Sequence, residues 1–233
     1  MSGFTPLIIL ILSMVILLLL QVTPGIFAIF YHFALGKNSI KKSDDYALNF
    51  IAGTEIFYGL MWLLSYTIIF AFFYNTEIPI IIVWTLAGIF FALSIVSFCF
   101  YYKKTKKSSA TFVPRRIVRG ILARSERTNS RLDAGLLGFF ANVPELFFTL
   151  PLLLMCSIIL QTFITIPHAV FIIVAIILST IPLFVIRHFY RTGYNLADII
   201  RFRIKIKPYI RIALAITFLL IAIFSIMYGV YYG

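Results

Sequence analysis

Glu55 and Glu145 are the only two carboxyl side chains deep inside apolar stretches of the sequence. A charged side chain at the centre of a membrane helix costs about 2.5–3.5 kcal/mol on insertion scales, so such residues usually face the protein interior or a water-filled path. In a low-dielectric site a carboxyl takes up a proton more readily. We therefore expect each glutamate to exchange a proton or to hold a cation. The alternative is a protonated glutamate that only hydrogen-bonds a neighbouring helix.

The dipeptide Pro24-Gly25 interrupts the hydrophobic run from Phe4 to Leu35. One straight helix over that run would be about 50 Å long at 1.5 Å per residue, whereas the hydrocarbon core of a bilayer is about 30 Å thick. Either the helix extends beyond the membrane, or proline and glycine break it. Backbone groups freed at membrane depth must be satisfied by protein or by a water-filled cavity. A simple proline kink is the alternative.

Hydrogen-bonding side chains lie near both features. The two glutamates and Pro24 lie at similar distances from those ends of their spans that the charge pattern below assigns to the cytoplasm. We therefore expect one binding layer for a solute or ion, in the cytoplasmic half of the membrane. Its predicted residues are Gln21, Thr23, Pro24, Gly25, Thr54, Glu55, Asn142, Pro144 and Glu145.

The other reactive residue types give weaker signals. Cys99 and Cys156 form no CxxC motif and are expected to pack as small hydrophobes; a thiol–disulfide conduit is the alternative. His32, His168 and His188 lie near span ends on different sides of the membrane, which makes a poor metal cluster. The sequence has no P-loop, HExxH, GxSxG or Rossmann pattern. We therefore expect no enzyme activity, cofactor or metal.

The composition predicts the fold class. Of 233 residues, 62% are hydrophobic and only 12% are charged, and the mean hydropathy is +1.03. No soluble domain of this length could cover so much apolar surface. We expect an all-α membrane protein, a single integral domain over residues 1–233 with six transmembrane helices. The expected spans cover approximately residues 4–35, 46–74, 80–102, 134–164, 169–186 and 212–232.

The 20 Lys and Arg residues all lie in or beside the connectors after spans one, three and five. The positive-inside rule then puts these connectors in the cytoplasm and both termini outside, in a multi-pass protein of the plasma membrane. The net charge of +12 therefore indicates topology and contact with anionic lipid, and not nucleic-acid binding. The basic segments are 36–45, 103–133 and 187–211.

Two of these segments raise a question of conformation. Within the segment 103–133, Pro114–Arg124 places apolar residues on one helical face with arginines around the rest. This pattern is typical of a short amphipathic helix in the headgroup region, and a solvated charged loop is equally compatible. Within the segment 187–211, residues 201–207 alternate between basic and apolar types without an obvious strand partner, so their conformation stays open.

Six spans divide into three and three, and an odd number inverts the second half relative to the first. Each half opens with a long, proline-interrupted span, a pattern that points to the binding region of a transporter. The match is imperfect, because Pro24 lies about two-thirds along its span and Pro144 lies about one-third along its own. By relative position along the span, Pro151 corresponds better to Pro24. A 3+3 inverted repeat is therefore indicated but not established.

Short motifs resemble the LysE-like exporter superfamily of small six-span carriers, which export amino acids and related solutes and include relatives that handle cations. The motifs are Thr23-Pro24-Gly25, the small-residue stretch Ala47–Gly53, Gly138–Pro144 with its Gly-Phe and Asn, and the basic turn Lys207–Arg211.

The sequence departs from that family at two points. Pro24-Gly25-Ile26 stands where many members have Pro-Gly-Pro, and Asn142-Val143-Pro144-Glu145 stands where they have Asn-Pro-Lys. A glutamate in place of a lysine favours a cation.

The expected function is that of a secondary transporter, an exporter of a small solute such as an amino acid or a cation. Coupling would come from an ion gradient, because the sequence has no ATP-binding element. The alternative is a non-transporting membrane subunit or scaffold whose basic cytoplasmic face docks a partner. The expected partners are the bilayer with its anionic lipids and the small solute or ion, and a homo-oligomer stays open.

Overall fold

The computed structural model describes residues 4–22, 40–73, 77–99, 104–105, 108–109, 130–162, 167–192 and 196–232. Over these residues it confirms the all-α fold, with six helical segments long and apolar enough to cross a membrane. The helices are α1 (Phe4–Gln21), α3 (Ile40–Phe73), α4 (Ile80–Cys99), α6 (Arg131–Ala141), the 3-10 turn η2 (Val143–Glu145), α7 (Leu146–Thr162), α8 (His168–Arg191) and α9 (Leu196–Tyr232). A minimal hairpin pairs β1 (Lys104–Thr105) with β2 (Ser108–Ser109).

The structure describes the first part of the first expected span as α1, and the rest of that span lies outside the described residues. Helix α1 ends at Gln21, where the Val22 N–H donates to the Leu19 carbonyl at 3.2 Å in a tightened last turn. The expected break at Pro24-Gly25 lies outside the described residues, as does the helix expected over Pro114–Arg124. The fourth span covers Arg131–Thr162, as α6, η2 and α7 together.

Two basic segments are largely continuous with membrane helices. Helix α3 begins at Ile40, so its first turns belong to the segment 36–45. Helix α9 begins at Leu196 and passes through Pro208 without ending. The stretch 201–207, whose conformation the alternating sequence left open, is therefore helical.

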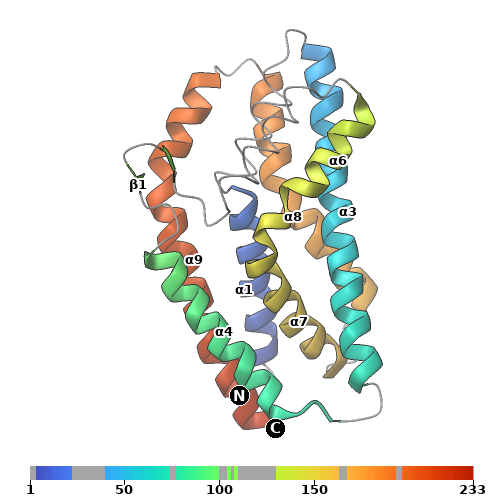
Figure 1. Ribbon diagram of the computed structural model, residues 1–233, viewed down its shortest axis with the longest axis vertical. Coiled ribbons are helices and arrows are strands. Elements are labelled where there is room, and N and C mark those ends of the chain that lie inside the picture. Colours follow the sequence, from blue (N-terminus) through green and yellow to red (C-terminus); the bar gives the residue numbers. More distant parts are fainter. Residues whose placement is uncertain are drawn as a thin grey trace.

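Helix α1 lies in the middle of the bundle and contacts α7, α8 and α9 (Figure 1). Helix α3 packs against α6, α7 and α8, and α4 packs along α9. Aromatic side chains fill the interior between α4, α7 and α9, where Phe218 stacks on Phe90 with ring centroids 6.4 Å apart and also contacts Phe148. The core is therefore one continuous apolar cluster around α1.

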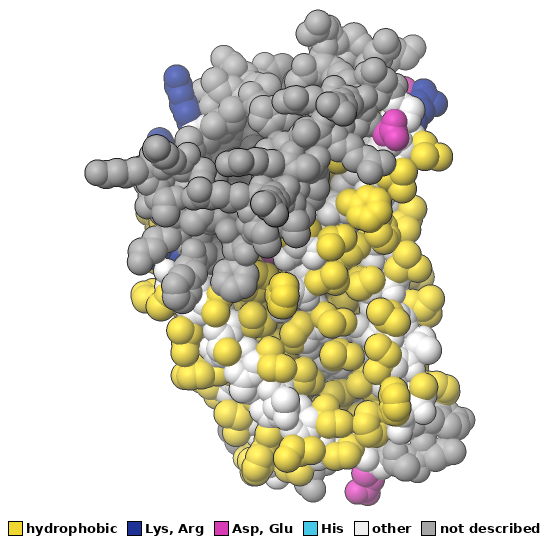
Figure 2. Space-filling model, in the orientation of Figure 1, with side chains coloured by type: hydrophobic (Ala, Val, Ile, Leu, Met, Phe, Trp, Pro, Cys, Tyr) yellow, Lys and Arg dark blue, Asp and Glu magenta, His cyan; other side chains and the backbone are white. Residues whose placement is uncertain are grey.

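The outer surface of the bundle is apolar. Hydrophobic side chains cover most of the described surface that Figure 2 shows, while charged side chains gather at its ends. Phe4, Ile81 and Phe147 are each about 70% exposed, at 71%, 68% and 72%. An apolar surface of this extent, on helices long enough to span a bilayer, is typical of contact with lipid tails. The protein is therefore a multi-pass membrane protein in contact with the bilayer.

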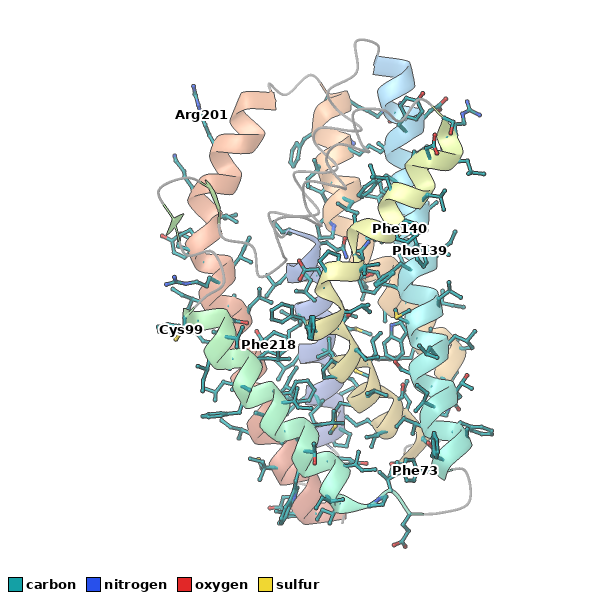
Figure 3. All side chains as sticks on the ribbon, in the orientation of Figure 1. Phe73, Cys99, Phe139, Phe140, Arg201 and Phe218 are labelled. Atoms are coloured by element: carbon teal, nitrogen blue, oxygen red, sulfur yellow. The ribbon has the colours of Figure 1, made fainter. Side chains whose placement is uncertain are left out.

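The two ends of the molecule differ in charge. The N- and C-terminal ends lie together at the lower end in Figure 1, and the first turns of α3 and α6 lie at the upper end. Arg131, Arg187, Asp44 and Asp45 meet at that upper end, in ion pairs between α3, α6 and α8. Arg201 also lies toward this end (Figure 3).

Glycines let α3 and α6 touch backbone to backbone. A Cβ atom on Gly53 would overlap the Gly135 carbonyl, and one on Gly138 would overlap the carbonyl of Phe50. Such close crossings between membrane helices require residues without side chains. This contact sets the distance between Thr54 on α3 and the residues that follow α6.

Candidate functional site

The fourth span bends at Asn142–Glu145. The Asn142 N–H donates to the Phe139 carbonyl at 3.4 Å, which closes α6, and the Glu145 N–H donates to the Asn142 carbonyl at 2.9 Å. Pro144 has no N–H to donate, so the chain forms a 3-10 turn before α7 begins. Phe139 and Phe140 mark the end of α6 beside this bend in Figure 3. The bend points Asn142 and Glu145 into the bundle, where both are buried.

A polar cluster, defined here as Gln21, Thr54, Tyr58, Asn142 and Glu145, joins three parts of the chain. Asn142 Oδ1 accepts from Gln21 Nε2 at 3.2 Å, and Asn142 Nδ2 donates to Thr54 Oγ1 at 3.3 Å. Gln21 Nε2 also donates to the Tyr58 hydroxyl at 2.6 Å. The cluster therefore connects the end of α1, the middle of α3 and the bend of the fourth span.

The cluster is removed from solvent. Gln21, Thr54, Tyr58 and Asn142 are 0% exposed, and Glu145 is 6% exposed. Glu145 lies in the same bend as Asn142, three residues farther along the chain, and its side chain is buried with it. Burying so many polar groups is unfavourable unless each finds a partner. Yet no donor among the described residues reaches Gln21 Oε1.

This arrangement presents hydrogen-bond acceptors to its interior. Gln21 uses its amide nitrogen on Tyr58 and Asn142, which leaves Oε1 as an acceptor. Glu145 adds carboxyl oxygens. Tyr58 accepts from Gln21 and keeps its own hydrogen to donate. A small group with N–H donors or a positive charge complements these acceptors.

The structure brings together four of the residues expected in the binding layer, Gln21, Thr54, Asn142 and Glu145. Pro144 contributes the bend, and Thr23, Pro24 and Gly25 lie outside the described residues.

Glu55 belongs to a different environment. Its Oε1 accepts a hydrogen bond at 3.1 Å from Thr180 Oγ1 on α8.

Tyr58 and Thr180 were not among the residues expected from sequence. Tyr58 lies four residues after Thr54, and residues at that spacing share a helix face. Thr180 follows Ser179 and precedes Pro182, a polar pair beside a proline in an otherwise apolar stretch. Both signals are readable in the sequence, but neither indicates which neighbour the side chain meets.

The remaining reactive residues lie apart from the cluster. Both cysteines are free: Cys156 is buried in the core, and Cys99 is exposed at the end of α4 (Figure 3). His168 Nδ1 lies 3.1 Å from the Tyr66 hydroxyl, near the far end of α3. The described residues include no group of three His, Cys, Asp or Glu side chains that could hold a metal ion.

Comparison of the chain with protein-family models, with curated proteins and with solved structures found no match.

Proposed function

We propose that this protein is a secondary transporter that moves a small polar solute across the membrane, driven by an ion gradient. The observation that carries the proposal is the buried polar cluster at the bend of the fourth span. Its side chains come from α1, α3 and the 142–145 turn, and Gln21 Oε1 has no donor among the described residues. Binding sites at broken helices near mid-membrane are typical of secondary transporters.

The chemistry of the cluster favours a solute with a positively charged or N–H-rich group. Gln21 Oε1 and the Glu145 carboxyl offer acceptors in a water-poor site, where a complementary charge is bound strongly. The ammonium of an amino acid or a small cation meets this requirement. Export as the direction of transport follows from the resemblance to LysE-like carriers.

The packing of the six spans supports alternating access by two inverted halves. Each span of the first half packs on its counterpart in the second half. The first and fourth spans meet as α1 and α7, the second and fifth as α3 and α8, and the third and sixth as α4 and α9. Helix α1 also contacts α8 and α9, just as the fourth span contacts α3 and α4. If each span is exchanged for its counterpart in the other half, the same pairs of helices are in contact, as expected of an inverted repeat.

The orientation proposed is that of the positive-inside rule, in the plasma membrane. The end that bears Arg131 and Arg187 faces the cytoplasm and its anionic lipids, and both termini lie outside.

Transport by the purified protein in vesicles tests the proposal. A panel of radiolabelled amino acids and small cations is offered, and Thr54→Val is compared with Thr85→Val. Thr54 bonds to Asn142, whereas the exposed Thr85 hydroxyl donates only to the Ile81 carbonyl of its own helix. We expect a solute whose flux is lost in Thr54→Val and kept in Thr85→Val. A folded protein that moves no solute of the panel in either direction would instead favour the scaffold.

A further inference from the structure

Glu55 lies on a different face of α3 from the polar cluster. Thr54 and Tyr58 face α1 and the fourth span, whereas the Glu55 carboxyl reaches α8 and accepts from Thr180 at 3.1 Å. Thr180 is 0% exposed and Glu55 is half-buried. The two membrane carboxyls, Glu55 and Glu145, therefore have separate surroundings.

The Thr180 hydroxyl can serve Glu55 in both protonation states. Thr180 Oγ1 lies 3.1 Å from Glu55 Oε1 and 3.0 Å from the Ile177 carbonyl oxygen. A hydroxyl has one hydrogen and two lone pairs. When Glu55 is ionised, Thr180 donates its hydrogen to the carboxylate. When Glu55 is protonated, the acid donates to Thr180 Oγ1 and the threonine hydrogen turns to the Ile177 carbonyl. Both states are hydrogen-bonded without movement of a heavy atom.

No described cation lies beside Glu55 to hold it ionised. On α8, Arg187 is the charged residue nearest to Thr180 in sequence, and it lies about 10 Å farther along the axis, two helical turns away. Arg187 is also paired with Asp44. The described titratable or charged groups on the elements that pack against α3 are Arg131 and Asp133 on α6, Glu145 in η2, Cys156 on α7, and His168, Arg187, His188 and Arg191 on α8.

The turn of α8 that holds Thr180 is weakened by a proline. Pro182 lacks an N–H, so the Leu178 carbonyl loses its helical donor. Proline is a common cause of bending in a helix. A change in the Glu55–Thr180 contact therefore acts at the point where α8 bends most easily.

We infer that Glu55 and Thr180 form a proton-binding site on the seam between α3 and α8, distinct from the solute cluster. One proton passes from a hydronium ion to the Glu55 carboxylate, so that an O–H bond of the hydronium ion breaks as the O–H bond of the neutral acid forms and one water molecule is left. The proton leaves by the reverse step. That the proton bound at Glu55 couples transport rests on the proposed transport function. The binding of the proton at Glu55 does not rest on it.

Infrared difference spectroscopy of the purified full-length protein in phosphatidylcholine vesicles tests the site without any solute. A pH titration follows the C=O stretching band of a protonated carboxylic acid. Among the bands that titrate, we expect one that is missing in Glu55→Gln, remains in Glu145→Gln and moves to higher frequency in Thr180→Val, which removes the hydroxyl but keeps the shape.

Each departure from that pattern overturns the inference. The first departure is that Glu55→Gln removes no titrating band. The second is that the band it removes is also lost in Glu145→Gln. The third is that this band is lost on adding Na⁺ at fixed pH, which would mark a sodium site. If Glu55→Gln does not fold, Thr180→Val decides, since an unchanged frequency rejects the contact.

The transport measurement is a separate arm. Once a solute is known, Glu55→Gln should retain solute binding and lose the pH dependence of flux. If no solute is transported, the proposed function fails while the infrared result still stands.

Discussion

The guanidinium of Arg187 donates two hydrogen bonds to Asp44, from Nε to Oδ1 at 2.7 Å and from Nη2 to Oδ2 at 2.8 Å. This pair joins the end of α8 to the start of α3, and its side chains are only 16% and 22% exposed. The neighbouring pair, Arg131 with Asp45, joins α6 to α3 at 2.6 Å but is 72% and 42% exposed. The first pair fixes the end of the α3–α8 seam that is proposed to face the cytoplasm.

Breaking the partly buried pair should weaken the fold more than breaking the exposed one. We expect Arg187→Gln to lower the free energy of unfolding by about 1–3 kcal/mol, as for charge-assisted hydrogen bonds. Arg131→Gln is the matched control, with an expected effect of about 0.2–1 kcal/mol. Thermal unfolding in detergent measures both. The double exchange Asp44→Arg with Arg187→Asp should recover part of the loss, and equal effects of the two single variants would contradict the prediction.

The backbone contact between α3 and α6 should not tolerate a methyl group. Gly53→Ala and Gly138→Ala each force a Cβ into a carbonyl of the facing helix. We expect each to cost about 1–3 kcal/mol, as for overpacking. Gly88→Ala is the control, because a Cβ there meets nothing within 4 Å and alanine favours a helix. Thermal stability in detergent distinguishes them, and a Gly53→Ala variant as stable as Gly88→Ala would show that the helices separate easily.

The Tyr58 hydroxyl should matter to both stability and transport. Tyr58→Phe removes the acceptor that lies 2.6 Å from Gln21 Nε2. We expect a loss of about 1–3 kcal/mol in unfolding free energy, since a buried donor loses a partner, and reduced solute flux. Tyr209→Phe is the control, because Tyr209 is 71% exposed. Tryptophan fluorescence during unfolding and vesicle uptake give the two readouts. Normal flux in Tyr58→Phe would remove this hydroxyl from the transport path.

Glu145→Gln should stop or uncouple transport while the amount of folded protein stays the same. Glutamine keeps the shape and hydrogen bonding of the neutral acid and removes the titratable group. A structural, protonated glutamate makes the opposite forecast, because glutamine would then be tolerated. Flux in vesicles over a range of pH separates the two, with Glu77→Gln, an exposed position outside the helices, as control. A normal rate and pH profile in Glu145→Gln would favour the scaffold.

Reporter fusions should place the C-terminus outside and the segment 103–133 inside. The charge pattern predicts this orientation, and the structure puts both chain ends at the opposite end from the first turns of α3 and α6 (Figure 1), where Asp44 and Asp45 form their ion pairs. A cytoplasmic C-terminus would invert the protein and move the Asp44–Arg187 pair to the outer face.

Hydropathy was enough to predict the class of fold, and the spacing of polar residues along each span was enough to predict which of them lie in one layer. A bilayer requires about 20 apolar residues per helical crossing, and hydropathy locates these along the chain. Pro144 and its missing N–H locate the bend of the fourth span. Distance from a span end gives depth, so Gln21, Thr54 and Asn142 could be expected in one layer, and they do meet.

Which of these residues share a site became clear from the packing of the helices. Glu55 and Thr54 are adjacent in sequence and nearly equal in depth, yet Thr54 bonds to Asn142 and Glu55 bonds to Thr180. Depth is a coordinate along the helix axis, and the sequence of one apolar helix says little about rotation around it. That rotation is fixed by contacts with neighbouring helices, here by the glycine crossing of α3 and α6 on one side and by the α3–α8 seam on the other.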